Sequence, residues 1–287
     1  MSEFKKRAIS FSIALGKGGM GLSPGSAVTV EGLRVIASYT AYNGLSQPQF
    51  YMSVFGMPLD MINELTTIGV HYTERRNNVL TVMAGEDGGD MPVVFKGTIT
   101  TAYGDFQAAP DVVFNVIANA GAIDAATIAD PLSYPDEIAV TDIITTIAGN
   151  MGLRPEINGV DGVMFKCRCY HGSNLTQLQT VCEEAHLNYS IDRETLAVWA
   201  IGTSKRNATF DISPDTGMVG YPQFTSDYLV VTTLLNPELV CGSLINVSSE
   251  ITPACGQWQV VHVTHEFESE MPNGQWFTRC EASRWNG

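Results

Sequence analysis

Apolar residues that alternate with polar or small ones constrain this chain more than any other feature of its sequence. Near the N-terminus Ile9, Phe11, Ile13 and Leu15 alternate with serines and an alanine. Successive side chains of a β-strand point to opposite faces, so this period of two predicts a strand with one buried face. Runs of the same kind predict further strands at residues 27–39, 49–55, 79–83, 93–101 and 112–118.

Helical periodicity is confined to a few stretches. A short helix is expected around residues 61–68, and a longer one over residues 140–151, where Gly152 is placed to end it. A further helix is expected at residues 175–186. Ser173 and Asn174 mark its start, and Gln177 takes the capping-box position if Asn174 is the cap.

Turn signals divide the remaining strands. The sequence GEDGGD suits a hairpin tip between residues 79–83 and 93–101, because glycine and aspartate tolerate positive φ. A hairpin that turns at residues 192–195 follows the last predicted helix, and MPNG marks another turn before Trp276. After residue 207 strands are expected near residues 229–233, 244–248, 257–267 and 276–282.

These patterns predict a mainly β chain with an α/β segment in the middle. We expect three domains: a β domain at residues 1–122, a small α/β domain at residues 123–206 and a second β domain at residues 207–287. A length of 287 residues is enough for two or three such domains, each with its own core.

Charge is distributed unevenly along the sequence. The formal net charge is −14, and from residue 207 onward nine acidic residues face only two basic ones, Arg279 and Arg284. Surfaces that hold nucleic acid rely on lysine and arginine, so this composition argues against tight DNA binding. A solubilising surface is the plainer interpretation, and a surface that must not adhere to a passing polyanion is the sharper one.

Six cysteines are dispersed through a chain in which we recognise no signal peptide, so we interpret them as reduced core thiols. No run of 18 apolar residues occurs, and no membrane insertion is expected. The four N-glycosylation sequons are accordingly expected to carry no glycan; they begin at Asn174, Asn188, Asn207 and Asn246.

Three groups of residues suggest ligand chemistry, and each has a plainer explanation. Gly16, Gly18 and Gly21 match the dinucleotide-binding spacing, but a strand follows them where a phosphate-binding helix is required, so a hairpin loop is favoured. His262 and His265 are three apart in a predicted strand, a spacing that sends them to opposite faces instead of toward one metal ion.

Cys167 and Cys169 could share one face of a strand, with His171 as the nearest additional ligand. A buried thiol pair is the favoured interpretation. The tryptophans could form a carbohydrate platform, but core or interface anchors are favoured; they are Trp199, Trp258, Trp276 and Trp285. No nucleophile elbow occurs, so we assign no catalytic, cofactor-binding or metal-binding residue and expect no enzyme and no cofactor.

The order of several motifs resembles the baseplate hub proteins of contractile-tailed phages. Toward the C-terminus these motifs are NPELVCGSLINVSS and then WQVVHVTHEFESEMPNGQWFTRCEAS. KGTITTAYGDFQAAPDVVFNVIANAG in the first third, and YHGSNLTQLQTVCEEA followed by ISPDTGMVGYPQ, are also similar to that family. Each motif consists of turn residues and alternation, but their combined order is specific. The chain has no room for the fused lysozyme domain of larger members, so lytic activity is not carried over.

The resemblance implies two tube-type β-barrel domains that flank the α/β domain, and a homotrimeric ring. Three subunits with two such domains each would match a six-fold tail tube above and a three-fold central spike below. The implied partners are the tail tube protein, the spike, other baseplate proteins and the tape measure protein. DNA would pass through without tight binding, in a virion assembled in the host cytoplasm.

Two other classes of function remain as alternatives to this structural role. One is a virion-associated peptidoglycan hydrolase, and the other is a carbohydrate- or receptor-binding tail module that uses the tryptophans. Within the structural class, the sequence does not separate a phage from a phage-derived injection device.

Overall fold

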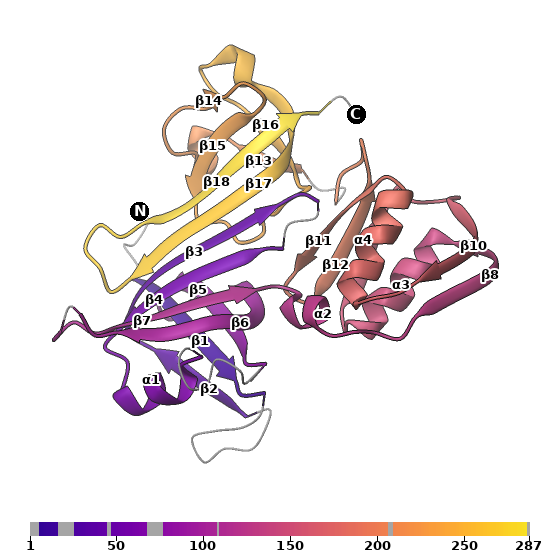
Figure 1. The fold of residues 1–287 in the computed structure, drawn as a ribbon. Helices are drawn as coiled ribbons and strands as arrows, with labels where there is room; N and C mark the ends of the chain where they lie inside the picture. Colours follow the sequence, from indigo (N-terminus) through magenta and orange to yellow (C-terminus); the bar gives the residue numbers. More distant parts are fainter. Residues whose placement is uncertain are drawn as a thin grey trace. The chain divides into compact units, whose positions relative to one another are not determined.

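The computed structural model describes residues 6–16, 26–44, 47–67, 77–107, 109–205 and 209–285, and in these the chain is mainly β with few helices (Figure 1). Two compact units emerge from the contacts. Unit 1 comprises Met1–Thr40, Gln49–Ala120 and Thr264–Phe277, and unit 2 comprises Ala41–Pro48, Gly121–Val263 and Thr278–Gly287. Each unit combines segments that lie far apart in the sequence. The division into three domains at residues 122 and 206 stays a prediction.

Unit 1 is built on an antiparallel sheet in the strand order β3-β4-β7-β6-β5-β1-β2. The strands are β1 (Arg7–Ala14), β2 (Ala27–Glu31), β3 (Arg34–Tyr42), β4 (Gln49–Phe55), β5 (Val79–Glu86), β6 (Val93–Asp105) and β7 (Val113–Asn119). The helix α1 (Leu59–Leu65) follows β4, and part of β17 (Gly256–Ser269) with the start of β18 (Trp276–Arg284) completes the unit.

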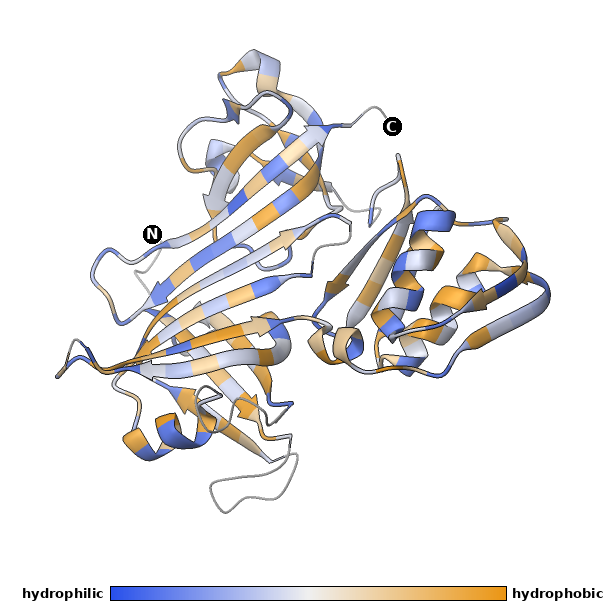
Figure 2. Cartoon of the chain, in the orientation of Figure 1, coloured by the Kyte–Doolittle hydropathy of each residue, from blue (hydrophilic) through white to orange (hydrophobic). Residues whose placement is uncertain are grey.

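Alternation in the sequence produces the core of unit 1. Ile9, Phe11 and Ile13 are at most 3% exposed, which confirms the predicted strand and its buried face. Figure 2 shows hydrophobic and hydrophilic residues alternating along the strands. Inside the sheet the Phe50 and Phe95 rings stack at a centroid distance of 4.6 Å. Aromatic pairs of this kind stabilise a fold by about 0.5–1.5 kcal/mol beyond the area they bury.

One strand prediction in this unit is wrong. Residues 27–39 do not form a single strand, because Gly32 turns the chain with φ +72° between β2 and β3. The hairpin between β5 and β6 and the short helix α1 are confirmed, although Ile68, the last residue of that helical pattern, lies outside the described residues.

The α/β part of unit 2 contains the helices α2 (Ala122–Ala126), α3 (Val140–Asn150) and α4 (Asn174–Glu184). β8 (Leu132–Ala139) pairs with β10 (Met164–Tyr170), and β11 (Leu187–Asp192) pairs with β12 (Thr195–Ala200), which pairs in parallel with β9 (Arg154–Asn158). Both longer helices and the hairpin turn at residues 192–195 are confirmed.

The predicted cap of α4 needs one correction. Ser173 is the N-cap, and its Oγ accepts a hydrogen bond from the Thr176 N–H at 3.2 Å. Asn174 is therefore not the cap. Gln177 is fully buried and its Nε2 donates to the Asp130 carbonyl at 3.0 Å, so it ties the helix to the preceding loop instead of completing a capping box.

The remainder of unit 2 is β. It contains β13 (Thr209–Ile212), β14 (Gln223–Phe224), β15 (Leu229–Leu234), β16 (Leu244–Val247) and the remaining parts of β17 and β18, with 3-10 turns at Pro214–Thr216 and Thr252–Ala254. The strands predicted from residue 229 onward are confirmed. Within the described ranges, no helix combines the length and apolarity needed to cross a bilayer.

Candidate functional site

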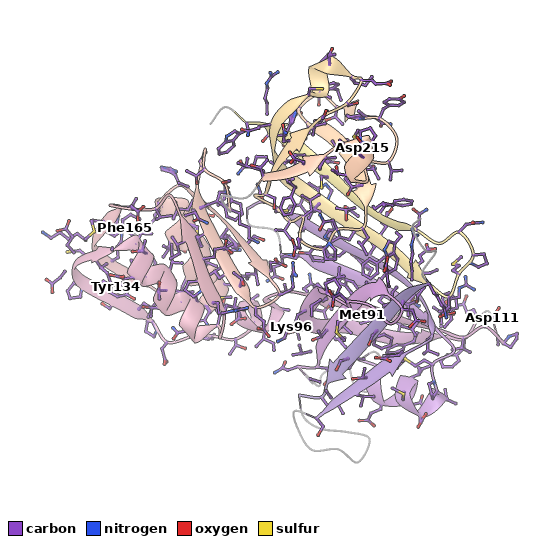
Figure 3. The ribbon with its side chains drawn as sticks, turned by 180° about the vertical axis from the view of Figure 1, so that it is seen from behind. Met91, Lys96, Asp111, Tyr134, Phe165 and Asp215 are labelled. Carbon is purple, nitrogen blue, oxygen red and sulfur yellow. The ribbon has the colours of Figure 1, made fainter. Side chains whose placement is uncertain are left out.

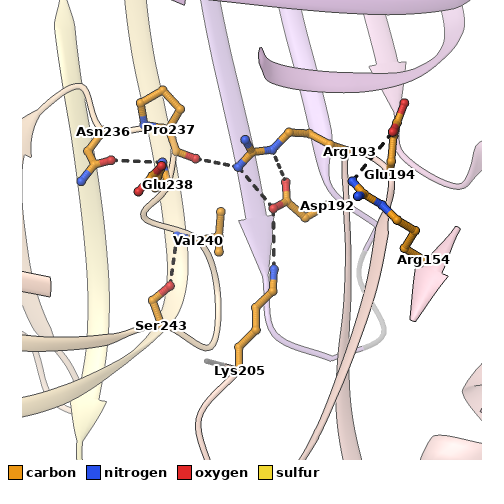
Figure 4. Close-up of polar contacts among 10 residues, drawn as sticks. All are labelled: Arg154, Asp192, Arg193, Glu194, Lys205, Asn236, Pro237, Glu238, Val240 and Ser243. Carbon is orange, nitrogen blue, oxygen red and sulfur yellow. Dashed lines mark hydrogen bonds and ion pairs between the residues drawn. The ribbon is translucent and has the colours of Figure 1, made fainter. Parts of the chain in front are cut away.

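A buried ion cluster lies at the hairpin turn between β11 and β12 (Figure 4). Asp192 accepts hydrogen bonds from Arg193 Nε at 3.1 Å and Arg193 Nη2 at 3.3 Å, and its Oδ2 lies 3.7 Å from Lys205 Nζ. Asp192 is 7% exposed and Lys205 is 1% exposed. Charges this deeply buried are tolerated when they are paired, so the three side chains depend on one another.

The cluster connects the α/β segment to the last third of the chain, within unit 2. Arg193 Nη2 donates to the Pro237 carbonyl at 2.9 Å. That carbonyl is held by a local turn, in which Asn236 Oδ1 accepts from the Glu238 N–H at 3.1 Å and the Asn236 N–H donates to Thr278 Oγ1 at 2.9 Å. The Asn-Pro pair of the C-terminal motif therefore positions an acceptor for a guanidinium from another segment.

A second feature is a patch of uncharged polar residues on one face of the sheet of unit 1. Three rows of paired residues cross the sheet from β3 or β4 to β6: Thr40-Gln49-Asn119-Thr98, Ser38-Tyr51-Ile117-Thr101 and Ser53-Asn115-Tyr103. Most of these side chains end in a hydroxyl or an amide, and none is charged. Lateral hydrogen bonds join them, including Ser53 Oγ to Asn115 Oδ1 at 2.7 Å. The next row on that face, Arg34-Phe55-Val113-Asp105, carries one charge of each sign.

The chemistry of this face is weak toward ions of either sign. Hydroxyl and amide groups offer hydrogen bonds but no net charge, so they neither hold phosphates as lysine and arginine do nor repel them as carboxylates do. Tyr51 and Tyr103 remain 43% and 37% exposed, which makes the face accessible in this chain. We name these three rows the polar face.

Comparison with known families decides the identity. The sequence pattern of the family described as Baseplate hub gp41 matches residues 21–278, which is most of the chain.

The chain belongs to this baseplate hub family.

The hub protein also shares its fold with solved tail proteins. Its match to the 43 kDa tail protein of prophage MuSo2 from Shewanella oneidensis covers 98% of the hub protein and 97% of that chain, with a TM-score of 0.61 and 10% identity. A tail protein from Neisseria meningitidis MC58 gives a TM-score of 0.62 at 10% identity, covering 98% of both chains. No match is found among curated protein sequences.

A third similar structure comes from a secretion machine. It is an Escherichia coli component of the type VI secretion system, itself described as structurally similar to the bacteriophage T4 tail proteins gp27 and gp5. The TM-score is 0.61 at 10% identity, over 89% of the hub protein and 74% of that chain. Identities this low show a shared fold, and the resemblance to baseplate hubs inferred from the sequence motifs is confirmed by the family match.

His262 and His265, the pair examined for metal binding, do not converge on a common point. His265 is 1% exposed and stacks on Tyr39 at 5.4 Å, whereas His262 stacks on Tyr42 at 4.0 Å with Nδ1 3.5 Å from Glu281 Oε2. Each ring therefore packs against its own aromatic neighbour. Among the described residues, no group of three His, Cys, Asp or Glu side chains is placed to hold a metal ion.

The prediction of a buried thiol pair at Cys167 and Cys169 is wrong, because both are exposed. Their strand β10 pairs with β8 in a sheet of two strands, where Figure 3 labels Tyr134 and Phe165. Pro135 has no N–H for this ladder, the register slips there, and Cys167 takes φ +53°.

The core-thiol interpretation is confirmed for three other cysteines. Cys182, Cys241 and Cys280 are buried and free. Burial raises the pKa of the Cys182 and Cys241 thiols to about 12, and burial raises the pKa of Cys280 further. Cys241 Sγ also donates to the Ala41 carbonyl at 3.2 Å, which fixes it as a structural thiol.

The tryptophans of the hub protein act mainly as core anchors. Trp199, Trp258 and Trp276 are 0%, 6% and 8% exposed, so they offer no open stacking surface, and Trp285 is half-buried.

Of the glycines with dinucleotide-binding spacing, Gly18 and Gly21 lie outside the described residues. The Gly16 N–H donates to Asn78 Oδ1 at 3.1 Å directly after β1.

A pocket of about 610 Å³ in unit 1 is lined by hairpin turns. Its polar groups bond to one another: Lys6 pairs with Glu270, Ser10 Oγ donates to Glu31 at 3.0 Å and Ser269 Oγ donates to the Leu33 carbonyl at 3.1 Å. The hydrogen bond with Glu270 raises the pKa of Lys6. These polar groups of the pocket thus already have partners within the protein.

Neither the ion cluster nor the polar face was predicted from the sequence. Asp192 and Arg193 were predicted only as part of a hairpin turn, and Lys205 was assigned no role. The sequence signal for the polar face is the recurrence of hydroxyl and amide side chains at alternate positions, namely Ser38 and Thr40, then Gln49, Tyr51 and Ser53, then Asn115 and Asn119.

Proposed function

We propose that this baseplate hub protein forms a homotrimeric ring that joins the six-fold tail tube to the three-fold central spike and lets DNA pass. The observation that carries the proposal is the family match over residues 21–278 on a mainly β chain. In the proposed ring the first and last thirds act as two tube-type β-barrel domains, flanking an α/β domain, so three subunits supply six β domains.

The polar face is the surface that we assign to the channel, together with the acidic last third. Duplex DNA carries about one negative charge per 1.7 Å, so a basic wall would retain it. Exposed charges act over roughly 10 Å at 0.1 M salt, so a charged wall would act on DNA that passes within that distance. Hydroxyls, amides and carboxylates together would let the genome slide.

The ion cluster would give the subunit mechanical stiffness. Arg193 links the α/β segment to the Asn-Pro turn of the last third through the Pro237 carbonyl, while it and the buried Lys205 both pair with the buried Asp192. Separation of these groups would leave buried charge without its partner. A hub under axial load benefits from segments that cannot slide apart.

The proposed partners are the tail tube protein, the spike, other baseplate proteins and the tape measure protein, in a virion assembled in the host cytoplasm. We propose no catalytic step. Release of soluble fragments from purified cell walls would instead favour a peptidoglycan hydrolase, and a positive glycan array would favour a receptor-binding module.

Mass measurement in solution together with electron micrographs tests the proposal. We expect particles of three times the 31.1 kDa chain mass, with a central hole, alone or on addition of the tail tube protein. A monomer under both conditions would contradict the ring. Tight binding of duplex DNA at about 0.1 M salt would contradict the channel while leaving the ring intact.

A further inference from the structure

The edge strand at the β14 end of the large sheet is interrupted. β14 stands at one end of the strand order and pairs with β15 only through Gln223↔Val230 and Phe224↔Leu229. Further along β15 the pairing resumes, where the Leu234 N–H donates to the Gly217 carbonyl at 2.9 Å. Between the two stretches Gly220, with φ +71°, takes the chain out of the ladder.

Aromatic side chains are exposed around this interruption. Tyr221, Phe224 and Tyr228 are 62%, 52% and 39% exposed. The Phe224 ring lies 6.2 Å from the ring of Trp258, which is only 6% exposed, so it rests on a rigid part of the core. Exposed tyrosine and phenylalanine on a rigid support are typical anchors of protein interfaces.

The charged residues in the segments that form this edge are all acidic. The sequence contains no lysine or arginine from residue 209 to residue 278. Asp215, which Figure 3 labels, and Asp227 are exposed, and Glu250 accepts a hydrogen bond from the Tyr221 hydroxyl at 3.3 Å. Arg284 is a cation beside this aromatic cluster, because its guanidinium lies 5.9 Å from the centroid of the Trp258 ring.

We propose that this edge, defined by residues 217–224 with Tyr228 and Glu250, docks an extended, lysine- or arginine-rich segment of another protein. The backbone of β14 supplies strand-pairing groups, Tyr221 and Phe224 supply apolar contacts, and the carboxylates select cations. The interruption limits pairing with unrelated strands, because only a short part of the edge is regular. The docking edge shares no residue with the polar face, and the inference goes beyond the proposed passage of DNA because it names a protein partner for part of the acidic last third.

The test uses the full-length protein and a fluorescent synthetic dodecapeptide in which lysine alternates with threonine and valine. Binding is followed by fluorescence anisotropy at about 0.1 M salt. The double variant Tyr221→Ser, Phe224→Ser removes both anchors and keeps every charge. The matched control, Leu59→Ser, Phe106→Ser, removes two apolar side chains of similar exposure, 58% and 49%, from unit 1.

We expect saturable binding to the wild type and to the control variant, and at least about tenfold weaker binding to the Tyr221, Phe224 variant, the loss expected for aromatic anchors. Circular dichroism and the thermal midpoint establish that both variants are folded. Glu250→Lys should weaken binding as well, and an N-methylated peptide, which cannot pair with a strand, should not bind.

Three results would overturn the inference: no binding of the lysine peptide, equal binding to wild type and to the Tyr221, Phe224 variant, or equal binding of a peptide with glutamate in place of lysine. Self-association that depends on Phe224 would replace the proposed partner with a second copy of this chain. The three overturning results bear neither on the trimer mass nor on DNA binding, whereas self-association that depends on Phe224 would be seen in the mass measurement.

Discussion

Gly242 lies directly against the indole ring of Trp199: a Cβ atom on Gly242 would come within 2.7 Å of Cζ2 of Trp199 and 2.8 Å of Cβ of Lys205. Gly242 also has φ +81°, a backbone conformation that side chains disfavour. It belongs to the CGS sequence of the last third, whereas Trp199 belongs to β12. This glycine lets the two segments of unit 2 approach each other beside the ion cluster.

Gly242→Ala should lower the free energy of unfolding by about 2–4 kcal/mol, because overpacking and the positive φ both oppose the new side chain. Gly162→Ala is the matched control: its φ is +79°, but nothing lies within 4 Å of the added Cβ. The control should lose only about 1 kcal/mol. Urea unfolding measures both, and equal losses would refute a role for the Trp199 contact.

Lys205→Met should lower the free energy of unfolding by about 3 kcal/mol, because it removes one partner of a buried ion pair while Asp192 stays buried. Arg154→Met is the control, since Arg154 is 80% exposed at the side chain and lies 4.0 Å from Glu194. A change below about 1 kcal/mol is expected there. A loss at Lys205 no larger than at Arg154 would show that the cluster does not stabilise the subunit.

Cys167 and Cys169 should react with iodoacetamide in the folded protein much faster than the buried thiols Cys182, Cys241 and Cys280. With the pKa of Cys182 and Cys241 at about 12, these groups hold almost no reactive thiolate at pH 7.5, and burial also blocks access. Mass spectrometry of tryptic peptides measures the rate at which each cysteine is labelled. Labelling of all five at one rate, without denaturant, would contradict the described core.

Asp124→Asn should make the protein more stable at pH 7. Burial raises the pKa of Asp124, and a hydrogen bond from Asn174 Nδ2 at 3.5 Å opposes this only in part. The folded state therefore holds the proton more tightly than the unfolded state, so this group's stabilising contribution is complete below the unfolded pKa and is lost as pH rises through the folded pKa.

The gain in free energy of unfolding from Asp124→Asn should consequently shrink as pH falls from 7 toward 4. Denaturant titrations of both proteins across this range measure the difference, in which the other carboxylates cancel. A gain that is constant with pH would show that folding does not shift the pKa of Asp124, and a loss at pH 7 would show that the fold stabilises its charged form.

Local sequence patterns predicted most elements correctly where one face of an element is buried. Alternation located β1, β4 and β15 through β18, and helical spacing located α3 and α4, because the buried positions repeat with the period of the element itself. They were less reliable at exposed positions. β8 was not predicted, because its residues are half-buried or exposed and include Pro135.

Two predictions failed because the pattern of residue types does not specify strand pairing or the conformation of a single residue. Cys167 and Cys169 looked like core residues by type, but their sheet of two strands leaves them exposed, and which strands pair is a property of the whole fold. Residues 27–39 were predicted as one strand from their composition, but a positive φ at Gly32 ends β2 before β3 begins.

The sequence by itself determined the class of the protein, the position of most strands and helices, and the resemblance to baseplate hubs, since periodicity and turn residues are local. Only the tertiary structure brought Asp192, Lys205 and Pro237 into one cluster and aligned hydroxyl and amide side chains from four strands into the polar face. Both depend on contacts between residues far apart in the chain, and no local pattern encodes which distant partner a buried charge or a strand will find.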